Sequence, residues 1–195
     1  NDIAKLFFDH FQVPALKFLE EPVAQACGIG LQSCFLVRFD EKEASCSAVH
    51  NGVFIKEAFQ TSVLNQTIVN TYMKASARRE FTSHQWETLH TLMKAAATDS
   101  TYEQELTAIE TVRIPSHSYY WPPFDAREIL IKTPELIFRP EFILRDLGDR
   151  IFQYLPKSTP FDEYTSMVDL IVNCIRSVTN SNMREQMLQS IVLYG

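Results

Sequence analysis

Glycine is scarce in this chain of 195 residues. Only five are present, about 2.6% against a typical share near 7%. A loop that cradles phosphate groups needs clustered glycines, because these let several backbone N–H groups approach the ligand. The only close pair is Gly28 and Gly30, and neither G-x-G-x-x-G nor G-x-x-x-x-G-K-[ST] surrounds it. The sequence therefore contains no complete nucleotide-binding loop.

An excess of positive charge is also missing. The chain has 18 Lys and Arg against 24 Asp and Glu, a formal net charge of −6, which argues against binding to nucleic-acid phosphates. No run approaches the roughly 18 apolar residues of a membrane span, and the first residues do not follow a signal-peptide pattern. We therefore expect no direct nucleic-acid contact and no membrane segment.

The few cysteines and histidines offer no metal site. The cysteines have no C-x-x-C spacing, and we expect buried free thiols in a reducing compartment rather than disulfides. No histidine has a partner at ligand spacing, so a metal is not expected. The four cysteines are Cys27, Cys34, Cys46 and Cys174.

The residues that are present favour a folded α/β protein. Apolar residues make up 46% and charged residues 22%, which is typical of a globular chain with one core or two small lobes. Hydrophobic periodicity and breaker residues give the order of elements. Helices are expected from Asp2 to Phe11, Val23 to Cys27, Leu64 to Arg79, Thr82 to Ala96, Thr159 to Val178 and after Asn182. Strands are expected at Ala15–Leu19, Cys34–Val37, Ala44–Val49, Val53–Phe59, Glu128–Lys132 and Ser190–Tyr194.

Three local patterns are the most specific. Asn51-Gly52 between two strands predicts a hairpin, and Thr82 with Gln85 predicts a capping box. The late helix has apolar residues at steps of 3 and 4, which predicts a core-facing stripe. The stripe consists of Phe161, Tyr164, Val168, Ile171, Ile175 and Val178.

Several motifs allow both a functional and a structural interpretation. Glu20-Glu21 could serve catalysis, but carboxylates at a helix start are expected from the helix dipole alone. Asp40-Glu41-Lys42-Glu43 fits a solvated turn, and Asn65-Gln66-Thr67 fits both a glycosylation acceptor and a helix start. The aromatic cluster Tyr119-Tyr120-Trp121, followed by Pro122-Pro123, suits a partner contact and core packing equally well.

Four features of the chain occur in a characteristic order: Phe11 followed by Pro14-Ala15, the hairpin glycine Gly52, the segment from Lys132 to Phe142, and the segment from Met183 to Gly195. In this order and spacing they resemble actin and the actin-related proteins. Family members carry a phenylalanine and a Pro-Ala at the first place and a glycine in the hairpin. The two later segments are similar to the family's C-P-E-x-L-F-x-P-x-F and I-R-x-x-L-x-x-N-I-V-L-S-G.

This resemblance implies the later half of an actin-like (RNase H-like) fold with a small inserted α-rich lobe. Residues 1–82 and 128–195 would form the third subdomain with the crossover helix that precedes it. Residues 83–127 would form a lobe like the fourth subdomain. The first phosphate loop, the second subdomain and the C-terminal helices would lie outside this sequence.

The chain departs from the family where nucleotide would bind. The second phosphate loop, Asp-Ser-Gly-Asp-Gly, aligns with residues 38–42, so charged side chains replace both glycines and Arg38 replaces the first metal-facing aspartate. Glu21 replaces the glutamine that positions water, and Asn65-Gln66 replaces Ala-Gly. We therefore expect neither ATP binding nor enzymatic activity. The degenerate positions are Glu21, Arg38, Asp40, Glu41, Lys42, Asn65 and Gln66.

The resemblance implies a catalytically silent structural subunit of a large intracellular complex. Within the family, such members serve mainly chromatin-remodelling or histone-modifying assemblies, which implies a nuclear location. One alternative is a subunit of a cytoskeletal actin-like filament or capping complex in the cytoplasm. Another, from a different class, is an ATP-binding protein with a rearranged loop. The expected partners are protein subunits, including other actin-family proteins, with Tyr119, Tyr120 and Trp121 as the candidate contact.

Overall fold

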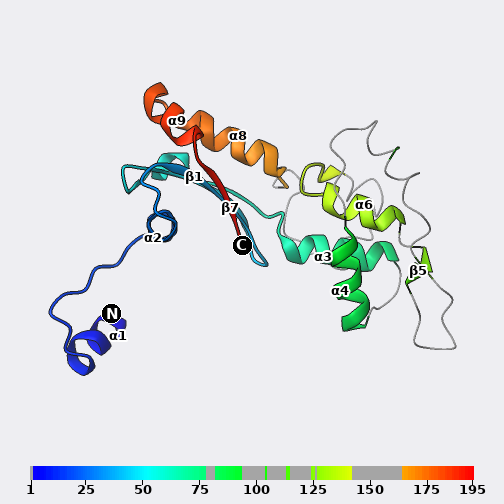
Figure 1. Ribbon diagram of the computed structural model, residues 1–195, viewed down its shortest axis with the longest axis horizontal. Coiled ribbons are helices and arrows are strands. Elements are labelled where there is room, and N and C mark those ends of the chain that lie inside the picture. Colours follow the sequence, from blue (N-terminus) through cyan, green and yellow to red (C-terminus); the bar gives the residue numbers. More distant parts are fainter. Residues whose placement is uncertain are drawn as a thin grey trace.

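A five-stranded mixed sheet with helices on both faces forms the centre of the structure (Figure 1). The computed structural model describes residues 2–77, 82–93, 104, 113–114, 124–125, 127–141 and 164–195. Over these residues the fold is α/β, as the sequence predicts.

The sheet has the order β3-β2-β1-β7, and β4 also pairs with β2. All its pairs are antiparallel except β1 with β7, which run parallel. Asn51 and Gly52 join β2 to β3 with φ of 50° and 72°, the left-handed backbone that a tight hairpin turn needs. The strands are β1 (Cys34–Phe39), β2 (Ala44–His50), β3 (Val53–Phe54), β4 (Gln60–Ser62) and β7 (Ile191–Tyr194).

Alternating side chains of the strands are buried on opposite faces of the sheet. On one face, Phe35 and Val37 of β1 pack under α8 (Met167–Ser177) and α9 (Ser181–Leu188). On the other face, Leu36 and Val49 pack against Ala26 of α2 (Glu21–Gly28). This alternation follows from the period of two in a strand.

A group of three helices packs beside the sheet (Figure 1). It consists of α3 (Gln66–Ala77), α4 (Ser83–Leu92) and α6 (Arg127–Glu135). Tyr72 and Leu136 lie in one of its cores, and Met73 and Leu89 lie in the other. Thr82 and Gln85 form the predicted capping box at the start of α4. The short strands β5 (Arg113–Ile114) and β6 (Phe124–Asp125) pair with each other.

The N-terminal segment extends away from the sheet (Figure 1). It begins with α1 (Asp2–Lys5) and a π-helical turn, η1 (Leu6–His10). Helical structure is predicted from Asp2 to Phe11 and is found from Asp2 to His10. The strand predicted at Ala15–Leu19 is wrong, because this stretch is extended without a pairing strand among the described residues. Phe18 and Leu19 are exposed, so the apolar pattern that suggested a strand finds no core here.

Two further predicted strands are also corrected. The stretch Val53–Phe59 is interrupted by a 3₁₀ turn, η2 (Lys56–Ala58), which buries Ala58. Glu128–Lys132 lies in α6, where Ile129 and Leu130 pack against α3 and α4. A fully buried apolar run has no period that separates a helix from a strand, which explains the error.

The late helix α8 begins later than predicted, but most of the predicted stripe lies at the core. Tyr164 and Val178 are buried, and Ile171 and Ile175 pack partly buried against the main core. Ser166 caps α8, and the buried residues of the helix are Met167, Leu170 and Cys174. Val168, a member of the predicted stripe, is 50% exposed, so the stripe is wrong at this position. Residues 159–163 of the predicted start lie outside the described residues. The cap of α9 is Asn180 rather than Asn182, because Asn180 Oδ1 accepts from the N–H groups of the next turn.

The cysteines partly follow the prediction. Cys34, Cys46 and Cys174 are buried free thiols, and burial raises the pKa of Cys34. A hydrogen bond with Cys46, together with burial, raises the pKa of Cys174. Cys27 is exposed, which corrects the expectation of burial for this residue.

Candidate functional site

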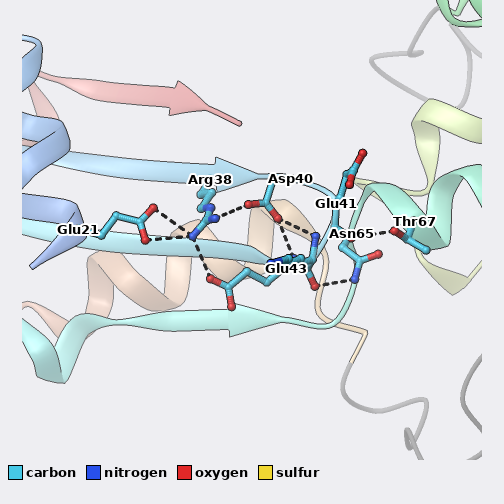
Figure 2. A network of polar contacts seen from close by, with 8 residues as sticks. Glu21, Arg38, Asp40, Glu41, Glu43, Asn65 and Thr67 are labelled. Atoms are coloured by element: carbon cyan, nitrogen blue, oxygen red, sulfur yellow. Dashed lines mark hydrogen bonds and ion pairs between the residues drawn. The ribbon is translucent and has the colours of Figure 1, made fainter. Parts of the chain in front are cut away.

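The structure brings the degenerate nucleotide positions together at one end of the sheet (Figure 2). Glu21 comes from the first turn of α2 and Arg38 from β1. The loop between β1 and β2 supplies Asp40, and the start of α3 approaches it from the far side. Three segments that are distant in sequence therefore meet around one turn.

Arg38 is the centre of the charged part of this site. Its Nη1 lies 3.1 Å from Glu21 Oε1 and 3.3 Å from Glu43 Oε1, and its Nη2 pairs with Asp40 Oδ2. The Arg38 side chain is 25% exposed and that of Asp40 is 22% exposed, whereas Glu21 and Glu43 are 54% and 44% exposed, so water screens the pairs with Glu21 and Glu43 more strongly than the pair with Asp40. One cation against three carboxylates leaves the cluster with a formal charge of −2.

Asp40 closes the turn with its own side chain. Its Oδ1 accepts from the N–H of Lys42 at 2.7 Å and from the N–H of Glu43 at 3.0 Å. These bonds from Glu43 and Lys42, helped by Arg38, hold the pKa of the Asp40 carboxyl below its ordinary value. The backbone donors of the turn are therefore occupied by an anion that belongs to the chain itself.

The start of α3 is fixed to the same turn. Asn65 caps the helix, because its Oδ1 accepts from the Ile68 N–H at 3.0 Å while its Nδ2 donates to Lys42 O at 2.8 Å. Thr67 Oγ1 donates to Glu41 O at 2.8 Å. Both polar side chains of the glycosylation pattern are thus used in the folded protein, which favours the helix-start interpretation of Asn65-Gln66-Thr67.

The charged groups of the site bind one another, and their arrangement is unfavourable for binding a phosphate. An anion entering the turn would compete with Asp40 for two N–H groups and for Arg38. It would also meet the carboxylates of Glu21 and Glu43, which repel a like charge. The predicted residues Glu41 and Lys42 contribute backbone carbonyls here, through the bonds from Thr67 and Asn65.

Sequence reasoning missed Glu43 and Thr67. The sequence predicts Glu43 in a solvated turn, and the antiparallel pairing of Phe39 with Ala44 places it opposite Asp40. The pairing of these two strands could have been predicted from the sequence, and it would have indicated that Glu43 lies opposite Asp40. Thr67 carried no signal, because its partner is a backbone carbonyl.

A second polar group surrounds the hairpin between β2 and β3. Ser33 Oγ lies 3.2 Å from His50 Nδ1 and accepts from the Asn51 N–H at 3.1 Å. His50 Nε2 contacts the Asn51 side-chain amide at 3.1 Å, and the Gly52 N–H donates to Gln32 O at 2.8 Å, so these bonds fasten the hairpin to the segment before β1. We therefore interpret this group as a clasp of the hairpin rather than a nucleophilic site.

The candidate partner residues Tyr119, Tyr120 and Trp121 lie outside the described residues. Within the described ranges, no group of three or more His, Cys, Asp or Glu is placed to hold a metal ion. Among the same residues, no helix is both long and apolar enough to cross a membrane.

Comparison with models of protein families gives no match for this chain, and comparison with curated proteins gives none either.

The charge of Asp40 should contribute to stability in a pH-dependent way. Its pKa is lowered on folding, so its contribution is present above its unfolded pKa of about 3.9 and is lost as the pH falls through the folded value. Asp40→Asn keeps the amide oxygen as an acceptor but removes the charge. We expect urea titrations to show a less stable variant at pH 7 and a smaller difference from wild type near pH 3. A difference that stays constant with pH would contradict this role of the charge.

Proposed function

We propose that this chain belongs to a catalytically silent actin-related protein that serves as a structural subunit of a large intracellular complex. The family resemblance supports the assignment through its ordered motifs, and the mixed α/β sheet is compatible with it. The observation that carries the absence of catalysis is the self-closed turn 40–43.

The physical argument concerns the donors that nucleotide binding would use. Phosphoryl-transfer sites work by positioning phosphates with backbone N–H groups and by neutralising their charge with cations. Here the N–H groups of Lys42 and Glu43 are bound by Asp40, and Arg38 is bound by three carboxylates. Binding a nucleotide phosphate would therefore require these contacts to break first.

If the site neither binds nor hydrolyses nucleotide, the role that remains for an actin-like fold is to assemble with other proteins. The proposed partners are protein subunits of a chromatin-remodelling or histone-modifying complex in the nucleus, including other actin-family members. This choice rests on the resemblance, which also allows a cytoskeletal complex. The proteins that copurify with the chain from cells would distinguish the two, because the expected partner sets differ.

The direct test is a calorimetric titration of the full-length protein with Mg·ATP. We expect no heat of binding in the micromolar range, because Asp40 and its partners occupy the donors. Nucleotide retained after gentle purification should also be absent. Micromolar binding accompanied by turnover would favour the alternative of an ATP-binding protein with a rearranged loop.

A further inference from the structure

Three consecutive residues at the start of α3 donate hydrogen bonds to three consecutive carbonyl oxygens of the β1–β2 loop. The bonds run from Asn65 Nδ2 to Lys42 O at 2.8 Å, from the Gln66 N–H to Asp40 O at 2.9 Å, and from Thr67 Oγ1 to Glu41 O at 2.8 Å. Figure 2 shows the side-chain bonds of Asn65 and Thr67 that link the helix start to the turn. We call this set the loop–helix staple.

The staple joins two parts of the molecule. The loop belongs to the sheet, while α3 belongs to the group of helices beside it (Figure 1). Apolar contacts also join these parts, since Phe39 packs against both the sheet core and the Leu64 core. Apolar contacts are not directional, whereas hydrogen bonds fix distance and angle. The Met167 N–H also donates to Ile137 O at 2.8 Å, which ties α8 to the segment after α6. The staple therefore adds three directional contacts at a second place on the boundary between the two parts.

The same turn is fixed from its other side. Asp40 uses its carboxylate for the turn and for Arg38, and Arg38 reaches Glu21 at the start of α2. The contacts thus run from α2 through β1 to α3 (Figure 2).

We propose that the loop–helix staple is a conformational lock, which holds the helical group in one orientation on the sheet without any ligand. The three donors bind carbonyls of the loop rather than groups within their own helix. The lock would operate inside or outside a complex, so it does not depend on the proposed function.

The test separates the staple from ordinary helix capping. In Asn65→Ser combined with Thr67→Val, serine still caps α3 but is too short to replace the bond to Lys42 O, and valine removes the bond to Glu41 O. We expect amide hydrogen exchange to become about tenfold faster in both segments, residues 40–43 and the first turn of α3, because two hydrogen bonds between them are lost. Exchange within α8, on the sheet face, should stay unchanged.

Two matched variants control the experiment. The single variant Thr67→Ser keeps the hydroxyl donor, so the exchange rate at residues 40–43 should equal that of the wild type. Thr71→Val removes a hydroxyl that donates only within the helix, to Thr67 O at 2.7 Å, and should leave the loop unaffected. Faster exchange confined to α3 in the double variant, or unchanged exchange in both segments, would overturn the lock and leave Asn65 as a simple cap.

Discussion

Leu170→Ala should lower the free energy of unfolding by about 2–5 kcal/mol. Leu170 lies on the buried face of α8 and is 1% exposed, between the sheet and the rest of the main core. Truncation there removes apolar contacts and leaves a cavity that Met167 and Cys174 can fill only in part. Chemical denaturation monitored by circular dichroism measures the change.

Val168→Ala is the matched control on the same helix. Val168 is half exposed, so its truncation should change the free energy of unfolding by no more than about 0.5 kcal/mol. The periodic pattern of the sequence predicts Val168 at the core together with Ile171 and Ile175, and among the described residues the structure contradicts it at Val168 alone. Equal losses for the two variants would show that α8 is rotated relative to the sheet.

Replacing Tyr120 and Trp121 together by alanine should weaken assembly with protein partners by at least about 2 kcal/mol. These aromatic residues precede Pro122-Pro123, which disfavours regular strand pairing and suits the display of side chains to a partner. Large aromatic residues are the most frequent energetic anchors of interfaces. Quantitative pull-down of the copurifying partners by wild type and variant measures the loss.

Thermal unfolding of the isolated chain decides between interface and core for this pair. We expect the double variant to unfold at the wild-type temperature, since an interface residue contributes little to the free chain. Phe138→Ala provides a comparison, because Phe138 is a 44% exposed aromatic residue of the described chain and should affect neither measurement strongly. If the double variant assembles normally, or if its melting temperature clearly falls, Tyr120 and Trp121 are core residues rather than interface residues.

The candidate site was predictable in its members but not in its contacts. Alignment to the family motif selected Arg38 and Asp40, and charge alone suggested that phosphate binding is lost. The closure of the turn by Asp40 required the positions of the Lys42 and Glu43 N–H groups, which follow from the backbone path. An Asp in a turn favours such a bond to the N–H two residues on, but the bond forms only when the backbone path brings that N–H within reach.

Elements with a local physical cause were determined by the sequence. Asn51 and Gly52 adopt positive φ with little steric cost, which made the hairpin between β2 and β3 predictable. Thr82 and Gln85 satisfy each other's backbone donors within four residues, so the capping box at the start of α4 was predictable as well.

Elements whose form depends on distant contacts were decided only by the tertiary structure. The apolar run around Ile129 became a helix because it fills the space between α3 and α4, although its composition also suits a strand. Ala15–Leu19 has the composition of a strand, but a strand requires a neighbour to bond with its backbone, and none is present among the described residues. The sequence thus determined where the chain turns and caps its helices, while packing decided which face of each element is buried, because burial depends on what lies opposite.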